Sequence, residues 1–378
     1  MSQTPSKITN VTAFALKIPY EFDLLNQAFQ HRSDLCVVKI ETQSGVVGWG
    51  MTGITQATVI ERIINNVTKP LLIGTDALAT EKIWEQLYWQ LSPRGQTGYA
   101  SHAIAAIDVA LWDIKGKLWG QPVWKLLGGA RDTVPVYATF GLETFNREQL
   151  ASAALLWFEQ GFTRLKMKVG HNGLRRRDEP RPLAEVIVED VKRVQAVREA
   201  VGDEIELYID ANCNLDFYHA VELCRALEPY NIAFFEEPIT QNDVRQLADL
   251  RQQTSIRLAC GQNEGLAFRF RDFLVQQAVD VLQPNVVITG GYSQCAKIAG
   301  MAAAFNVPIC NGGAWPFHNM HLQGGLSNGW LVEWHFTAVL VCQQLYQNLP
   351  TPKNGYLKLP TTPGLGFAPD EARVAEFS

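Results

Sequence analysis

The chain has 378 residues, 47% of them hydrophobic and 19% charged, which predicts folded domains with a sizeable core. The formal net charge of -5, from 33 basic and 38 acidic residues, argues against nucleic acid or a membrane surface as a partner. No apolar run approaches the length of a membrane span, and the N-terminus lacks the apolar stretch of a signal peptide. We therefore expect a cytoplasmic protein.

The N-terminal region has the pattern of strands followed by helices. Residues 8–20 alternate between apolar and polar, and residues 34–50 have the pattern of a hairpin with its turn at Ser44 and Gly45. Helical patterns follow from about Thr55, and a long apolar helix is predicted over 101–120, ending at a glycine.

From residue 134 onward, short apolar strands alternate with helices. Repeated β–α units at this spacing predict a parallel sheet, and at least seven strands in one run favour a closed α/β barrel over an open sheet. The turn-rich tail, 355–367, is expected to return to the N-terminal region. The predicted barrel strands lie at 134–140, 163–170, 205–212, 232–238, 256–263, 279–287 and 307–313.

One charged segment interrupts this series. Residues 171–185 follow the second strand and contain Arg, Asp and Pro in place of an apolar pattern. A solvated loop is one interpretation, and a flap or a subunit contact is the other.

Polar residues stand at the end of nearly every predicted strand. In a barrel of this type the carboxyl ends of the strands form the functional face. Polar residues there, on strands with apolar bodies, are improbable as a packing accident. They are Lys166 and Lys168, Asp210 and Asn212, Glu236 and Glu237, Gln262 and Glu264, Gln283 and Asn285, and Asn311.

The two lysines are the most unusual of these residues. Lys166 and Lys168 are two positions apart, so their side chains share one face of the strand. A solvated edge strand would show the same alternation, but the polar ends of the other strands favour a functional site.

Three oxygen-bearing side chains come from three successive strands. Asp210, Glu236 and Gln262 would together offer hard oxygen ligands without His or Cys, which suits Mg²⁺. Taken singly, each of them is more often a helix cap or a turn residue. The combination with the two lysines favours a metal site.

The order of these motifs, K-x-K, D-x-N, E-E-P and G-x-N, resembles the mandelate racemase branch of the enolase superfamily. The resemblance extends over nearly the whole chain, through the stretches at 103–129, 189–202 and 360–367. It implies a modified TIM barrel, (β/α)₇β, with an α+β capping domain built from both chain ends.

This resemblance also implies domain limits and a chemistry. The capping domain would include 1–130 and the returning segment 336–378, and the barrel 131–335. The chemistry implied is Mg²⁺-assisted removal of the proton next to a carboxylate, with Lys168 as the base. A small carboxylate substrate and a homo-oligomer are implied as partners.

Physical chemistry agrees with those roles. Loss of an α-proton places a second negative charge on the substrate carboxylate, and a divalent cation stabilises that dianion. A base must be neutral, and the charge of Lys166 is expected to disfavour protonation of Lys168. Lys166 is also expected to help hold the substrate carboxylate.

The sequence departs from the family pattern in three places. Many relatives carry an Asp after the sixth strand and a His after the seventh, but this chain has Asn285, and Gly312 or Gly313, there. Racemisation by two opposed bases is therefore disfavoured. Gln262 replaces the usual Glu ligand, and Glu264 is the rival third ligand.

Other candidates surround the expected site. His318, after the seventh strand, is proposed to replace the missing His as an acid or a hydroxyl ligand, with Trp315 beside it. Glu333 matches a family position that bonds the substrate, and Asn212 and Asn285 are further expected substrate contacts. Tyr20 is expected in an N-terminal loop that closes over the barrel in the family.

With one base and no opposed pair, elimination is the simplest reaction. We expect a Mg²⁺-dependent acid-sugar dehydratase, a lyase that forms a 2-keto-3-deoxy sugar acid through an ene-diolate. The alternatives are a racemase, an epimerase or a lactone cycloisomerase, and a non-catalytic relative that retains the fold.

Overall fold

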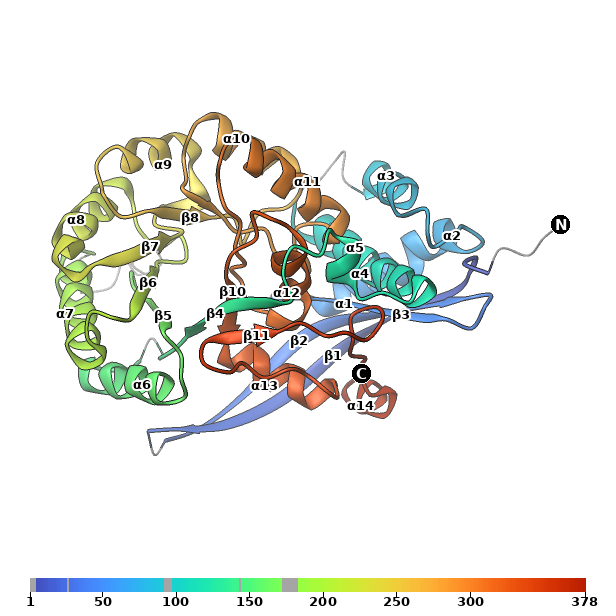
Figure 1. Cartoon of the computed structure of the whole chain (residues 1–378), viewed down its shortest axis with the longest axis horizontal. Helices are drawn as coiled ribbons and strands as arrows, with labels where there is room; N and C mark the ends of the chain where they lie inside the picture. The colour runs from blue at the N-terminus through green and yellow to red at the C-terminus, as the bar shows by residue number, and fades with distance from the viewer. Residues whose placement is uncertain (1–4, 26, 92–96, 143, 172–182) are drawn as a thin grey trace.

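The computed structural model describes residues 5–25, 27–91, 97–142, 144–171 and 183–378. A curled sheet with helices around its outer rim forms one part of the molecule, and a long antiparallel hairpin lies across the other (Figure 1). Most of the segment 171–185, interpreted above as a loop or a flap, is outside the described residues.

The capping region is built on three antiparallel strands. They are β1 (Ile8–Leu24), β2 (Gln27–Thr42) and β3 (Val47–Gly53). The predicted turn at Ser44 and Gly45 is confirmed, since these residues join β2 to β3. The expectation of a loop around Tyr20 is wrong, because Tyr20 pairs with His31 in the β1–β2 register. A strand forms there because the alternation of apolar and polar residues continues beyond residue 20.

Helices cover one face of this sheet. The longest, α4, is buried on nearly all sides and packs on β3 through Gly48 and Gly50. A Cβ at Gly50 would lie 2.0 Å from the carbonyl oxygen of Ala106, so only glycine permits this approach. The predicted end of the helix at Gly120 is confirmed by the φ of 63° there. The helices of this region are α1 (Ala57–Arg62), the π-helical turn η1 (Ile63–Thr68), α2 (Lys69–Leu72), α3 (Thr80–Leu91), α4 (Tyr99–Trp119) and α5 (Val123–Leu126).

The predicted α/β barrel is confirmed. Seven parallel strands are paired in the order β10-β4-β5-β6-β7-β8-β9, and Ile309 bridges β9 to Gly329, just before β10, so that the ring closes. In chain order the elements are β4 (Thr133–Thr139), α6 (Arg147–Glu159), β5 (Arg164–Lys168), α7 (Leu183–Val201), β6 (Glu206–Asp210), α8 (Phe217–Leu227), the 3-10 turn η3 (Glu228–Tyr230), β7 (Ile232–Glu236), the 3-10 turn η4 (Thr240–Asn242), α9 (Val244–Arg251), β8 (Leu258–Cys260), α10 (Ala267–Val275), β9 (Val281–Leu282), α11 (Gly291–Ala304), α12 (Pro316–Gly325) and β10 (Val332–His335).

The register of the central strands brings separate motifs to one level. Lys168 at the end of β5 pairs with Asp210 at the end of β6, which pairs in turn with Glu236 at the end of β7. Below them, Tyr137, Tyr208 and Phe234 form a fully buried aromatic layer that fills the barrel. The open end of the barrel is therefore the end that carries the polar residues.

The C-terminal segment packs against both the barrel and the capping region. After α13 (Phe336–Leu345), the strand β11 (Tyr356–Lys358) pairs antiparallel with β4 of the barrel. The chain then continues to the capping region, where α14 (Glu371–Phe377) packs near β1 and Glu371 pairs with Lys39. No helix in the described part of the chain combines the length and apolar character needed to cross a bilayer.

Candidate active site

A cavity of about 460 Å³ opens at the carboxyl ends of the barrel strands. Its walls come from the barrel and from the β1–β2 hairpin of the capping region. Most of the candidates predicted from the sequence meet there. The lining includes Tyr20, Thr139, Lys168, Asp210, Asn212, Gln262, Trp315, Glu333, His335 and Thr337.

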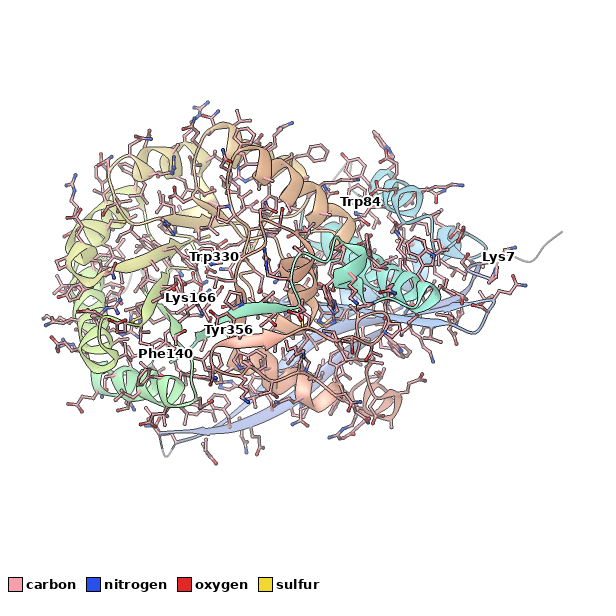
Figure 2. All side chains as sticks on the ribbon, viewed as in Figure 1. Lys7, Trp84, Phe140, Lys166, Trp330 and Tyr356 are labelled. Atoms are coloured by element: carbon pink, nitrogen blue, oxygen red, sulfur yellow. The ribbon has the colours of Figure 1, made fainter. Side chains whose placement is uncertain are left out.

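Lys166 lies below the cavity floor, in the interior of the barrel (Figure 2). Its Nζ is 2.7 Å from Glu236 Oε2, 3.0 Å from Glu333 Oε1 and 3.5 Å from Asp210 Oδ2. Burial opposes the charge of this ammonium group, but the surrounding carboxylates outweigh burial and raise the pKa of Lys166 well above its usual value. Lys166 is therefore a fixed cation among three acids.

Lys168, two residues further along β5, reaches the cavity itself. On the paired strand, Asp210 is 4% exposed and accepts two hydrogen bonds from Asn212, at 2.7 Å from the backbone N and 2.8 Å from Nδ2. Asn212 has a φ of 45°, a left-handed conformation that asparagine tolerates. This turn holds the Asp210 carboxylate at the cavity wall beside Lys168.

Glu236 is fully buried, and only one of its two carboxylate oxygens accepts hydrogen bonds within the described structure. Oε2 accepts hydrogen bonds from Lys166 and, at 2.8 Å, from Gln283 Nε2, whereas Oε1 has no hydrogen-bond partner within the described structure. Burial, reinforced by the charge of Asp210, raises the pKa of Glu236 well above its usual value. A Cβ at Gly312 would lie 2.9 Å from Oε1, so only a bare backbone fits against this oxygen.

Gln262 on the next strand is oriented by a second buried acid. Its Nε2 donates to Glu237 Oε2 at 2.8 Å, which leaves the amide oxygen on the side of Gly313. Burial and the charge of Asp210 raise the pKa of Glu237 to about 7. Glu264, the rival third ligand, is bound by Arg269 at 3.2 Å and does not line the cavity. The geometry favours Gln262.

These residues fit a hard divalent cation. Among the described residues, no three His, Cys, Asp or Glu side chains form a metal-binding group by themselves, so the third protein oxygen would come from an amide. The unpartnered oxygen of Glu236 lies against Gly312, and the amide oxygen of Gln262 lies beside Gly313. Asp210, Gln262 and Gly313 line the same cavity. An all-oxygen set with space for water and substrate is what Mg²⁺ prefers.

Glu333 closes the ring of acids on the side of β10. Its Oε1 accepts from Thr139 Oγ1, and its Oε2 accepts from the backbone N of Ala314 at 2.6 Å. Burial alone would raise its pKa, but Lys166 and His335, together with the hydrogen bonds from Thr139 and the Ala314 backbone, outweigh burial and hold the pKa of Glu333 well below its usual range. Trp315, at the start of α12, lines the cavity with a left-handed backbone, and Tyr20 reaches it from β1.

Asn285, expected to contact the substrate, lies elsewhere. It is fully buried, and its Nδ2 donates to the carbonyls of Gly312 and Gly313 at 2.8 and 3.0 Å. Asn285 therefore holds the backbone of Gly312 and Gly313 in place.

The expectation that His318 reaches the barrel mouth is not met. Its ring is 1% exposed and packs against Tyr346 and Phe367, and neither nitrogen has a hydrogen-bond partner within the described structure. Burial lowers the pKa of His318 to about 3, so the ring is neutral. Helix α12 directs this face into the core, a direction that the sequence pattern after residue 313 did not reveal.

A different histidine occupies the cavity. His335, at the end of β10, lines it, and its Nδ1 is 3.0 Å from Thr337 Oγ1. His335 is not among the site residues predicted from the sequence, although a signal was present. His335 is two residues after Glu333, and alternate residues of a strand share a face.

Comparison with known families agrees with this architecture. Residues 149–373 match the family described as enolase C-terminal domain-like, and residues 11–128 match the mandelate racemase / muconate lactonizing enzyme N-terminal domain. The two matches together span most of the capping region and the barrel.

Individual relatives cover nearly the full chain. An arabinonate dehydratase of Saccharolobus solfataricus is 31% identical over 92% of this chain and 91% of its own. The crystal structure of a 3,6-anhydro-D-galactonate cycloisomerase from Zobellia galactanivorans has a TM-score of 0.84 at 32% identity, covering 98% of this chain and 99% of that one. A racemase from Streptomyces coelicolor with bound magnesium has a TM-score of 0.86 at 29% identity, with the same coverage. The chain belongs to the enolase superfamily, in the group of mandelate racemase and muconate lactonizing enzyme.

Proposed function

We propose that this chain is a magnesium-dependent acid-sugar dehydratase. One observation carries the proposal: Lys168 and Asp210 line one cavity, and Asp210 pairs in turn with Glu236 on the next strand. Gly312 and Gly313 stand after the seventh strand, where many members of the family carry a second base. Among the described residues, Lys168 is the one lysine or arginine that lines this cavity. With a divalent-cation site beside it, such a base supports removal of one α-proton without its return to the other face. The dehydratase relative at 31% identity supports the same reaction class.

The roles of the residues follow from their chemistry. Asp210, Glu236 and Gln262 would hold Mg²⁺, which would supply positive charge to the substrate carboxylate as its α-proton leaves. Lys168 takes that proton, and Lys166 holds Glu236 and Glu333 in position through two ion pairs. Loss of the β-hydroxyl then gives an enol that becomes a 2-keto-3-deoxy sugar acid.

Cycloisomerisation is the second candidate. Two relatives of similar identity, from Streptomyces coelicolor (30%) and Zobellia galactanivorans (32%), are 3,6-anhydrogalactonate cycloisomerases. Such a reaction needs the same α-proton chemistry but conserves the mass of the substrate. Racemisation or epimerisation has less support, because it requires a proton donor on the opposite face.

Proton NMR in D₂O with Mg²⁺, across aldonic and aldaric acids, anhydro acids and their lactones, tests the proposal. A 3-deoxy-2-keto product is expected from at least one acid sugar, and Lys168→Ala should abolish it. An isomer of unchanged mass from an anhydro acid would replace the dehydratase assignment with a cycloisomerase. Exchange of the α-proton without loss of water from every substrate would favour an epimerase.

A further inference from the structure

The cavity contains a histidine at a strand end that the family resemblance did not point to. We propose that His335 is the catalytic acid of this enzyme, protonating the β-hydroxyl as it leaves, and that Thr337 and Tyr20 position it. The inference rests on the proposed dehydratase function and assigns the leaving-group step within it.

The geometry of β10 directs His335 into the site. Glu333 and His335 share the inward face of the strand, and both line the cavity. His335 pairs with Thr139 on β4, which pairs with Lys166 on β5. The ring therefore stands one inward position beyond Glu333, toward the open end of the barrel.

A hydrogen-bonded connection fixes the ring. Nδ1 of His335 lies 3.0 Å from Thr337 Oγ1, and Thr337 also interacts with the hydroxyl of Tyr20. Tyr20 belongs to the β1–β2 hairpin, so the capping region contacts the ring through one intermediate residue. With Nδ1 engaged, Nε2 is the nitrogen left to meet a substrate, and among the described residues no hydrogen-bond partner is found for it.

His335 and Lys168 stand on the same wall of the cavity. Their strands flank β4, so at about 4.8 Å per strand their backbones are roughly 10 Å apart. The wall opposite carries Gln262 and the glycines at 312 and 313. An acid and a base on one wall can serve one face of a substrate, which predicts syn elimination.

The groups around the ring act on the pKa of His335 in both directions. Burial and the ammonium groups of Lys166 and Lys168 lower the pKa of His335, whereas Glu333 and Asp210 oppose them. A ring whose pKa is lowered is the stronger acid once it carries a proton.

The step balances within the active site. Lys168 Nζ takes the α-proton, the electron pair forms the Cα=Cβ bond, and the Cβ–O bond breaks as the hydroxyl takes the Nε2 proton and leaves as water. The Lys168 ammonium then returns its proton to Cβ as the enol ketonises. The enol hydroxyl proton passes through solvent to the neutral imidazole, which restores both groups.

The variant His335→Asn separates this role from folding and binding. Asparagine retains a polar group near Thr337 but cannot deliver a proton, so turnover is expected to fall at least about 100-fold. Exchange of the α-proton in D₂O and Mg²⁺ affinity by calorimetry should stay within about threefold. Thr337→Val and Tyr20→Phe should cause smaller losses, of roughly tenfold. His219→Asn, on helix α8 outside the cavity, is the matched control.

A substrate analogue with fluorine in place of the β-hydroxyl gives the decisive readout. Fluoride leaves without full protonation, so His335→Asn should eliminate fluoride at a rate near that of the wild type. Failure of this rescue, or parallel loss of exchange and elimination, would show that His335 only positions the substrate. Unchanged dehydration in His335→Asn would overturn the inference while the dehydratase function stands. If the wild type dehydrates no acid sugar, the proposed function itself fails, and the inference with it.

Discussion

The ammonium group of Lys166 lies 2.7 Å from Glu236 and 3.0 Å from Glu333, with Asp210 at 3.5 Å. When all three acids are ionised, three carboxylates and one ammonium leave a net charge of about −2 in a buried space, which a divalent cation would neutralise. Burial and the charge of Asp210 raise the pKa of Glu236 and so oppose that state when no cation is bound. Lys166 and the proposed Mg²⁺ therefore stabilise the same acids.

Lys166→Met should destabilise the protein more without Mg²⁺ than with it. Removing the ammonium leaves the buried acids uncompensated, a cost of about 3–5 kcal/mol, and a bound cation would recover part of it. Thermal unfolding without Mg²⁺ measures the loss of stability, and unfolding in excess Mg²⁺ measures how much of it the cation recovers. The control is Lys297→Met, which removes a surface ion pair with Glu81. An equal loss of stability with and without Mg²⁺ would argue that Lys166 and the cation do not act on the same acids.

Gln262→Leu should weaken Mg²⁺ binding by at least about tenfold, because it removes the third protein oxygen. Glu264→Gln should leave the affinity within about threefold, since Glu264 is bound to Arg269 away from the cavity. Titration calorimetry with Mg²⁺ compares the two variants directly. The opposite ranking would make Glu264 the ligand.

Gly312→Ala should abolish turnover and weaken Mg²⁺ binding, because its methyl group would lie 2.9 Å from Glu236 Oε1 and from Gln283 Nε2. The control is Gly300→Ala in helix α11, where a methyl group meets no atom within 4 Å. That substitution should be neutral or stabilise the helix by roughly 0.5–1 kcal/mol. Full activity in Gly312→Ala would mean that the close approach of the Gly312 backbone to Glu236 is not needed for the reaction.

His318→Leu should raise the free energy of unfolding by about 1 kcal/mol and leave turnover unchanged. Both ring nitrogens are buried without a partner in the described structure, and leucine removes that desolvation cost at similar volume. Chemical denaturation and steady-state kinetics provide the measurements. A well-folded but inactive variant would show that His318 is needed for the reaction.

Asp108 links the capping region to the barrel and should make stability depend on pH. Its Oδ2 accepts from the backbone N of Ser293 at the start of α11, at 3.0 Å, and burial raises its pKa from 3.8 to about 7. Because the pKa is higher in the folded state, the unfolded state ionises first. Stability is then lost progressively as the pH rises from about 4 to about 7, and the contribution is constant above that.

Asp108→Asn should remove this dependence. The amide oxygen can accept the same hydrogen bond without becoming charged, so the variant should gain up to about 4 kcal/mol over the wild type at pH 8, and much less at pH 5. Denaturant unfolding at both pH values measures the difference, with Asp370→Asn at the exposed cap of α14 as the control. A gain that is equal at both pH values would show that Asp108 does not titrate in this range.

The barrel and its polar rim could be predicted from the sequence because both depend on local patterns. Alternating β–α units are readable one element at a time, and strand-end residues such as Asp210 and Glu236 must meet when parallel strands close into a ring. The place of Lys168 beside them follows from that register.

Where the chain leaves a strand, local patterns no longer determine the direction of a side chain. His318 and His335 both follow apolar stretches, yet packing of α12 against Phe367 buries the first, and the end of β10 exposes the second to the cavity. The sequence by itself determined the fold, the metal-binding chemistry and the lysine pair, since these rest on periodicity and on the register of neighbouring strands. Only the tertiary structure decided which histidine faces the cavity, because that depends on contacts between segments far apart in the chain.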